Sequence, residues 1–463
     1  MPHWQDPSPV RGTALCDLVT AARGHTLVVG PHDPGLIDAV PAGRITVLVR
    51  GVPDAEALAE RYASRPGFEV CCGSLEKLAA VPAYDTVIAL AGLERVTSTE
   101  SDGLTWDDSL AVLLATLRPG GRLLLGCENP SGLHRILAPG AEPGDDDWGS
   151  GLDDPARPVT LAALRDRLAA AGLPVLGDYA AFPSPDAPRA LISPAMLADP
   201  SVHGLLAGML RRAGLPEGPV LADPRPVLVP MLKSALAGEL APGWFVVASR
   251  GGAVSLPSAV LTSDQGERHS FVRAEHGWTR DGAGTVPEGR NLLDALLAAT
   301  RSRDLAAMRT LLAAWQGGEH AGVDAECLVV DGDGRLRDLG IGAAADPAVA
   351  LRNLIDAAPE GLDDLIEAMA GVEAAPSSSP ARVRVAAYRE VAAERDRLAR
   401  ELGEARARGD WYEQRLAARD GELARAYRII GVLKGTVPGR AATAVRGALR
   451  TGKRALKRIG RPS

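Results

Sequence analysis

The sequence contains no run of 18 apolar residues, and its first twelve residues, MPHWQDPSPVRG, have no apolar core. We therefore expect neither a membrane-spanning helix nor an exported precursor. The five cysteines lack the spacing of metal ligands, which predicts no metal site and a reducing, cytoplasmic environment. The net charge of −7 gives no general reason to expect nucleic acid as a partner. Aromatic residues are only 4% of a chain rich in alanine, so alanine-rich runs carry little structural information.

With 463 residues the chain is too long for one ordinary domain, and we expect two or three folded units. From residue 25 onward, short apolar segments alternate with amphipathic ones. The apolar segments HTLVVG, RITVLVRG, FEVCCG, YDTVIALAG and GRLLLGCEN predict strands, and DAEALAERYAS and WDDSLAVLLATL predict helices between them. Near-continuous apolar strands separated by helices predict a parallel sheet covered on both faces, a doubly wound, Rossmann-like α/β fold.

This first domain is expected to span residues 14–195. Its last part, VTLAALRDRLAAAGLPVLGDYAAFPS and PRALIS, predicts a helix, a strand and a short returning strand that closes the sheet at an antiparallel edge. Residues 196–372 predict a second, α+β domain, because FVVASR, HSFVRAEHG and ECLVVDGDGRLRDLG resemble strands and NLLDALLAATRSRDLAAMRTLLAAW resembles a helical pair. The segment AAPSSSP indicates a linker over 373–381.

Residues 382–433 carry apolar side chains at a seven-residue spacing, with Glu and Arg between them, which is typical of a coiled coil. The alternative is a single long helix that packs on a partner. Residues 434–463 hold nine Lys or Arg and no Asp or Glu, with Val445, Leu449, Leu456 and Ile459 at helical spacing. This pattern predicts a basic amphipathic tail that binds an anionic membrane surface, with a solvated charged tail as the alternative.

Two segments resemble class I S-adenosylmethionine (SAM) methyltransferases. YDTVIALAGLERV, a helix and then LRPGGRLLLGCEN are similar to the family's fourth strand, its helix and the Pro-Gly-Gly turn into the fifth strand. TLAALRDRLAAAGLPVL looks like the family's last helix and following strand. The resemblance covers roughly residues 14–195 and implies SAM as the cofactor, bound at the carboxyl ends of the strands.

By this resemblance a SAM site needs close backbone approach after the first strand, a carboxylate for the ribose, a polar group for the adenine and an apolar wall beside the ring. GPHDPG stands where the family usually has GxGxG, and an arginine stands where the ribose carboxylate is expected. A serine replaces the aspartate typical after the third strand. The residues that the resemblance assigns to the cofactor are Gly30, Gly35, Arg50, Ser74, Leu75, Leu90, Ala91 and Gly92.

Methyl transfer needs alignment, and it needs a base only when the acceptor hydroxyl must lose a proton. His134, just after the fifth strand, is the candidate base, with a surface histidine as the alternative. In the second domain, VPEGRNLLDALLAA and VDAECLVVDGDGRLRDLG resemble the hinge helix and catalytic hairpin of small-molecule kinases. Cys327 stands there in place of the metal-binding Asn, and Asp338 alone matches a metal-binding residue, so a plain β-hairpin is the alternative.

Two functional interpretations remain open. One is a cytoplasmic SAM-dependent methyltransferase that O-methylates a sugar or another small acceptor in surface-glycan assembly. The other is a catalytically silent methyltransferase-fold scaffold that holds partners at the inner face of a membrane through its coiled coil and basic tail. Both allow a coiled-coil partner or a homo-oligomer, and neither requires a specific nucleic acid. The first is the preferred interpretation, because the altered motifs still allow a weak or atypical SAM site, and the silent scaffold is the alternative.

Overall fold

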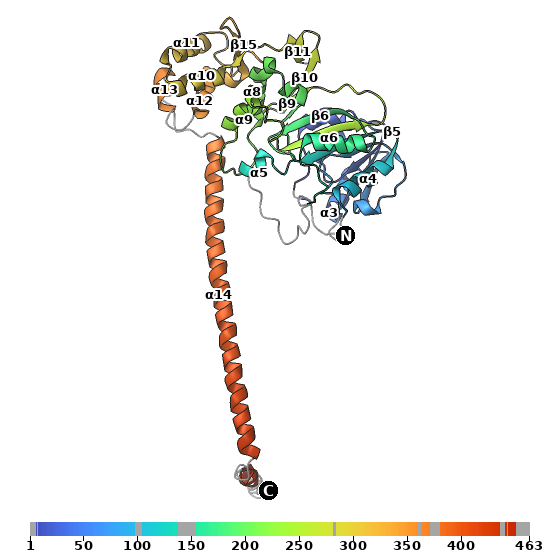
Figure 1. Ribbon diagram of the computed structural model, residues 1–463, viewed down its shortest axis with the longest axis vertical. Helices are drawn as coiled ribbons and strands as arrows, with labels where there is room; N and C mark the ends of the chain where they lie inside the picture. Colours follow the sequence, from blue (N-terminus) through green and yellow to red (C-terminus); the bar gives the residue numbers. More distant parts are fainter. Residues whose placement is uncertain are drawn as a thin grey trace, which may run out of the picture. The chain divides into compact units, whose positions relative to one another are not determined.

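The computed structural model describes residues 6, 8–97, 104–137, 154–280, 284–358, 363–370, 380–435, 440–441 and 443–450. The chain forms two units, residues 1–388 and residues 389–463 (Figure 1). The expected linker at 373–381 lies almost entirely outside the described residues, as does much of the expected tail at 434–463. No helix in the described ranges is both long and apolar enough to cross a bilayer.

The five predicted strands of the first domain are all present and form a parallel sheet. Their bounds are β1 (His25–Val29), β2 (Arg44–Val49), β3 (Phe68–Cys72), β4 (Tyr84–Ala89) and β5 (Leu117–Glu128). They lie in the order β3-β2-β1-β4-β5, and each neighbouring pair is parallel. This is the doubly wound order, in which the connections leave β1 and β4 toward opposite ends of the sheet.

Helices cover both faces of this sheet, as the apolar strands predicted. Val28, Val47 and Ile88 pack with one set of helices, α1 (Thr13–Val19), α2 (Pro34–Asp38) and α3 (Val52–Arg61). Leu27, Val29 and Val87 face the opposite way and pack with α4 (Trp106–Thr116) and α6 (Leu161–Ala170). Because successive strand side chains point to opposite faces, each buried strand needs apolar residues at almost every position.

The sheet does not end near residue 195. β6 (Val175–Phe182) pairs antiparallel with β7 (Ala190–Ile192), as expected, but the strand beside β5 is β8 (Gly243–Ser249). β8 runs antiparallel to both β5 and β6 and lies between them. Every residue of β8 is buried. The segment FVVASR is therefore a central strand of the first sheet and not part of the separate second domain that the sequence predicts.

Beyond β7 the same sheet continues as an antiparallel meander. Its strands are β9 (Ala259–Thr262), β10 (Arg268–Ala274), β11 (Gly277–Arg280) and β12 (Gly284–Thr285). A separate three-stranded sheet contains β13 (Arg290–Asn291), β14 (Leu328–Val330) and β15 (Leu336–Asp338). The predicted domains 14–195 and 196–372 therefore share one sheet and one compact unit, and residue 195 does not separate them.

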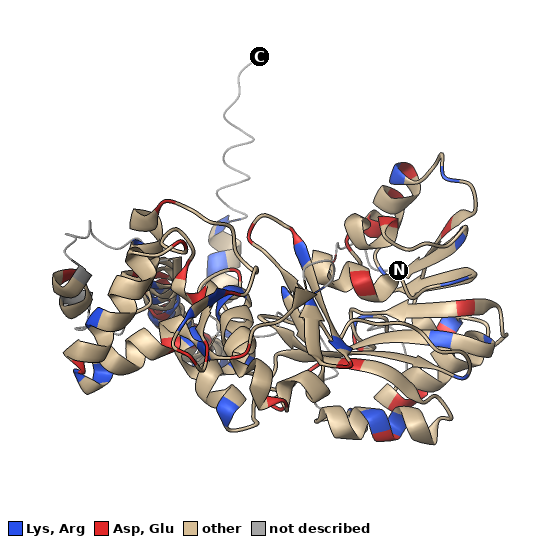
Figure 2. Ribbon diagram, turned by 90° about the horizontal axis from the view of Figure 1, so that it is seen from above, with Lys and Arg blue, Asp and Glu red and all other residues tan. Residues whose placement is uncertain are grey.

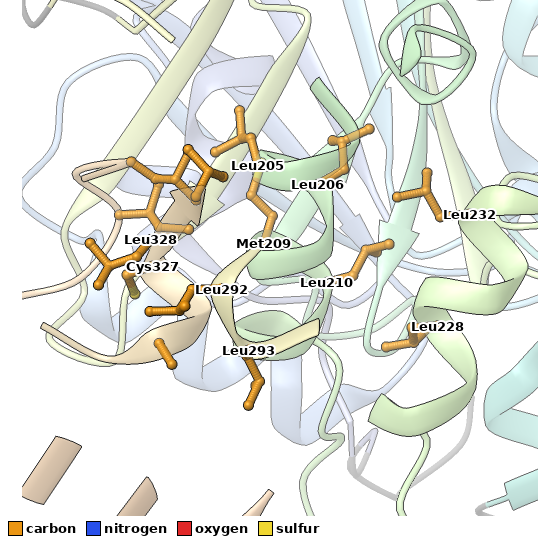
Figure 3. Packing of buried hydrophobic residues seen from close by; sticks show 14 of the residues in the cluster. Leu205, Leu206, Met209, Leu210, Leu228, Leu232, Leu292, Leu293, Cys327 and Leu328 are labelled. Atoms are coloured by element: carbon orange, nitrogen blue, oxygen red, sulfur yellow. The ribbon is translucent and has the colours of Figure 1, made fainter. Parts of the chain in front are cut away.

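The helices of residues 194–370 surround an apolar core that adjoins the meander. Their bounds are α7 (Pro194–Leu197), α8 (His203–Ala213), α9 (Arg225–Lys233), α10 (Leu292–Ser302), α11 (Leu305–Gln316), α12 (Pro347–Asp356) and α13 (Asp363–Ala370). Figure 3 shows Met209 of α8 among side chains from α8, α10 and the residues entering β14, with α9 close by. The predicted helical pair is α10 and α11, and the predicted hairpin is β14 and β15.

The long helix α14 (Pro380–Gly435) contains 56 residues. Its first turns belong to the first unit, where the backbone N–H of Val220 donates to the carbonyl of Arg384. From residue 389 the helix belongs to the second unit, and its side chains are almost all exposed. The structure thus confirms a long C-terminal helix over the predicted coiled-coil segment.

Candidate functional site

The carboxyl ends of β1, β2, β4 and β5 meet at one edge of the sheet because these strands are parallel. The crossovers from β1 and β4 diverge, so the edge between these two strands is the topological switch point, where doubly wound sheets bind ligands. A short helix, α5 (Leu133–Leu137), follows β5 at the same edge. In this fold a nucleotide-like cofactor would bind at this switch point.

His32 fills the space between the ends of β1 and β4. Its side chain is buried, with the residue 5% exposed. Its Nδ1 lies 3.0 Å from the Gly30 carbonyl oxygen, and its Nε2 lies 3.2 Å from the Leu90 backbone nitrogen. Because a carbonyl only accepts and an N–H only donates, the neutral tautomer with the proton on Nδ1 satisfies both contacts. Burial lowers the pKa of His32 to about 4, which keeps the ring neutral at pH 7.

The glycines of the first loop are also used within the protein. Gly30 has a φ of 90°, and a Cβ there would lie 3.2 Å from Val96 Cγ1 and 3.4 Å from Ala91 Cβ. The space left by the missing Cβ of Gly30 is therefore taken by the side chains of Val96 and Ala91. Gly35 lies in the first turn of α2, where its N–H donates to Asp33 Oδ1 over 2.8 Å. Gly35 thus serves a helix cap, because Asp33 occupies the N-cap position.

Arg50 lies at the position where the resemblance predicts a carboxylate for the ribose. Its guanidinium forms an ion pair with the carboxylate of Asp6. Arg50 Nη2 is 3.5 Å from Asp6 Oδ2, and the Asp6 side chain is only 6% exposed. Arg95 also pairs with Asp6, and its second terminal nitrogen lies 3.2 Å from Asp186 Oδ1. Burial raises the pKa of Asp186, so its arginine partner matters for keeping it charged.

The N-terminal segment that carries Asp6 is fixed beside the β1–α2 loop. The Val10 N–H donates to the Pro31 carbonyl over 2.9 Å, and the Asp33 N–H donates to the Val10 carbonyl over 2.9 Å. The Asp6 N–H donates to Asp54 Oδ2 over 3.0 Å. These bonds hold Val10 beside the β1–α2 loop and Asp6 beside the first turn of α3.

The other predicted cofactor residues converge on the same edge but are packed into it. Leu75 is fully buried, and its N–H donates to the Val96 carbonyl over 3.1 Å, while Ser74 beside it is also buried. Leu90 is buried against the α1–α3 face, and Ala91 contacts the position of Gly30. Gly92 has a φ of 87°, and a Cβ there would lie 2.4 Å from Glu94 Oε2. The structure therefore brings these residues together at the edge, with Leu75, Ser74 and Leu90 buried and Ala91 partly buried.

His134 lies on α5 and is held by Glu128. Its Nε2 is 2.9 Å from Glu128 Oε1, and its side chain is 14% exposed. Burial opposes the ionisation of Glu128, but the hydrogen bonds and charges of His134 and Arg135 outweigh it and lower the pKa of Glu128. The adjoining cavity, lined by Leu133, Phe182 and Leu228 among others, has a volume of about 10 Å³. That is room for one water at most, so no methyl acceptor fits beside His134 there.

A buried ion pair lies next to these groups. Arg157 Nε is 2.8 Å from Glu94 Oε1, and the Arg157 side chain is 2% exposed. Arg157 also donates to the Glu128 carbonyl over 2.8 Å. Burial raises the pKa of Glu94, and the charge of Arg157 opposes that shift. No local sequence pattern marks Asp6 or Arg157, because both reach the edge from segments far along the chain from the residues they contact.

Acidic and basic residues are interspersed along the described part of the first unit (Figure 2). In the kinase-like hairpin, Asp338 Oδ1 accepts from the Gly340 N–H over 2.7 Å, and Arg280 donates to the Gly340 carbonyl. Arg280 thus covers the turn after β15. Cys327 is fully buried, and burial raises the pKa of its thiol. Both residues of the kinase resemblance therefore have structural roles in the hairpin.

The strand order, with an antiparallel strand inserted beside β5, agrees with the family that the sequence resembles. Strands β1 to β6 and β8 have the arrangement of the class I methyltransferase fold. The sequence matches no protein-family model and no curated protein. Solved structures similar to the chain include methyltransferases and a [4+2]-cyclase, SpnF, all at low identity.

One is a Burkholderia thailandensis 1,6-didemethyltoxoflavin-N1-methyltransferase with bound S-adenosylhomocysteine, at 15% identity and a TM-score of 0.27, covering 52% of this chain and 78% of the other. A second is a geranyl diphosphate methyltransferase in complex with SAM, at 14% identity and a TM-score of 0.28, covering 52% and 85%. A third is the N-methyltransferase NodS of Bradyrhizobium japonicum WM9, at 12% identity and a TM-score of 0.26, covering 36% of this chain and 81% of the other. Likenesses this weak carry no information about cofactor, substrate or activity.

The described residues at the switch point do not fit SAM. A cofactor there would need the space of His32 and an acceptor for its ribose hydroxyls, and the chain places the Arg50 guanidinium at that position. Val96 and Ala91 occupy the side of Gly30 toward which a Cβ would point. The strands have the order of a methyltransferase fold, but the polar side chains at the carboxyl edge of the sheet form hydrogen bonds and ion pairs within the protein.

Proposed function

We propose that this protein is a catalytically silent methyltransferase-fold scaffold, with the long helix and the basic C-terminal segment as its binding elements. The observation that carries the proposal is His32, a neutral imidazole that bridges the Gly30 carbonyl and the Leu90 N–H at the switch point. The second support is the pairing of Arg50 with Asp6, which replaces a ribose acceptor by a cation that already has a partner.

A SAM-dependent methyltransferase would need these contacts to break before the cofactor could bind. Each buried group left without its hydrogen bond costs about 1–3 kcal/mol, which is one to two decades of affinity. The methylation of a sugar hydroxyl would also need a base with access to its substrate, and the cavity beside His134 is too small for an acceptor.

The experiment is calorimetric titration of the full chain with SAM and with S-adenosylhomocysteine. We expect no saturable heat with either compound up to millimolar concentration. The His32→Gly variant, titrated alongside, opens the space between β1 and β4 and is expected to bind more tightly than the wild type. Saturable binding of SAM to the wild-type protein at micromolar concentration would overturn the proposal and restore the enzymatic interpretation.

A further inference from the structure

Helix α14 carries an apolar stripe that no part of the second unit covers in the described residues. Its members are at the a and d positions of a heptad and are each exposed by 44% or more: Val391, Leu398, Leu402, Tyr412, Leu416, Leu423, Ile430 and Leu433. At 1.5 Å per residue the 56 residues span about 84 Å. A stripe of this length with a seven-residue period is the seam of a coiled coil, which buries it against another helix.

The charged residues that flank the seam indicate which helix pairs with α14 and in which register. In a parallel pair, the residue before an a position lies close to the residue five places further along the other helix. If the partner is a second copy in register, three successive heptads bring opposite charges together across the seam. These pairs are Glu401 with Arg406, Arg408 with Glu413, and Arg415 with Asp420, and each occurs twice by symmetry.

A shifted register loses this match. Moving one helix by a single heptad places Glu401 against Glu413 on one side of the seam and Arg408 against Arg406 on the other. Like charges at these positions disfavour the pairing. In register Leu402 forms a layer with its own copy, whereas a shift of one heptad sets it against Gly409.

An antiparallel pair along the whole of α14 fits less well. It would place the apolar end of the helix, with Ile430 and Leu433, against the first turns of the other copy. Those turns are already engaged, because Ala381 is buried and the Arg384 guanidinium donates to the Leu215 carbonyl over 3.4 Å. The exposed apolar positions of the seam therefore run from residue 391 to residue 433.

We propose that α14 is a homodimerisation helix that pairs with a second copy of this chain, parallel and in register, over residues 391–433. Arg395, Gly409 and Arg419 interrupt the apolar positions. These interruptions weaken the seam, so the charged flanks decide the register. This proposal identifies a second copy of the chain as the partner of the proposed scaffold. Its biological role rests on the proposed function, but the pairing itself does not depend on whether the first unit binds SAM.

The test is sedimentation equilibrium of the full-length protein with Arg408→Glu, Glu413→Arg and the double variant. Each single variant turns two attractive contacts into repulsive ones and is expected to weaken the dimer about tenfold. The double variant restores opposite charges across the parallel seam and is expected to recover the wild-type dissociation constant. Recovery is specific to the parallel register, because residues 408 and 413 face each other only between copies and lie outside i, i+4 spacing within one helix.

A crosslinking experiment checks the register directly. In a Cys71→Ser background, which removes an exposed thiol, Leu423→Cys places two thiols in one layer and is expected to give a disulfide-linked dimer under mild oxidation. Arg425→Cys, on the outer face of the same turn, is the matched control and is expected to stay monomeric on a non-reducing gel. A wild-type protein that is monomeric at tens of micromolar, or a double variant as weak as the singles, would refute the parallel dimer.

Discussion

Replacing His32 by glutamine tests whether this side chain is a structural bridge that must stay neutral. In the unfolded chain the imidazole titrates near 6.5, and in the folded protein burial lowers its pKa to about 4. Between these values the unfolded state binds more protons than the native state, so the free energy of unfolding falls as the pH is lowered. From pH 7 to pH 4.5 this single group removes about 2 kcal/mol of stability from the wild-type protein.

The glutamine variant has no such titration. At pH 7 we expect it to be less stable than the wild type by about 1–3 kcal/mol, because the two contacts to Gly30 and Leu90 are weakened or lost. As the pH falls, the wild type loses the His32 contribution and the variant does not. The two stability curves are therefore expected to approach each other by about 2 kcal/mol between pH 7 and pH 4.5.

The assay is urea unfolding of the full chain at several pH values, followed by fluorescence of the buried tryptophans, which include Trp106 and Trp244. His276→Gln is the matched control, because His276 lies exposed in the turn between β10 and β11. Its curve is expected to run parallel to that of the wild type. If the difference between wild type and His32→Gln stays constant with pH, His32 is not a buried neutral bridge and the account of the switch point fails.

Two further predictions concern the buried ion pair and the tail. Glu94→Gln leaves the Arg157 charge buried without its counter-ion and is expected to cost about 3 kcal/mol of unfolding free energy by calorimetry. Adding Arg157→Met should recover part of that loss, and a double variant less stable than Glu94→Gln would contradict the pairing. Deleting residues 434–463 removes nine basic residues and is expected to abolish binding to anionic vesicles, which should itself fall steeply with added salt. Neutral vesicles and duplex DNA are the controls, and equal vesicle binding by the truncated protein would exclude the tail as the membrane element.

The sequence by itself determined the local elements. The apolar runs from HTLVVG to GRLLLGCEN became β1 to β5, and the helices between them lie where the periodicity placed them. Such patterns are readable because a strand buried on both faces needs apolar residues throughout, whichever strand lies beside it. The seven-residue spacing of α14 can also be recognised in the sequence, because the repeat is a local property of the chain. The departure from the usual cofactor motifs at GPHDPG and Arg50 was equally visible.

Only the tertiary structure decided which segments meet. FVVASR was recognised as a strand, but its place between β5 and β6 depends on pairing with residues far away along the chain, and that choice is made by the whole core. Nothing local shows that His32 turns inward to join Gly30 and Leu90, or that Asp6 crosses the edge to reach Arg50 and Arg95. A polar side chain at a strand end can face solvent, a ligand or another strand. Burial and the available hydrogen-bond partners, which exist only in the folded chain, settle which of these it does.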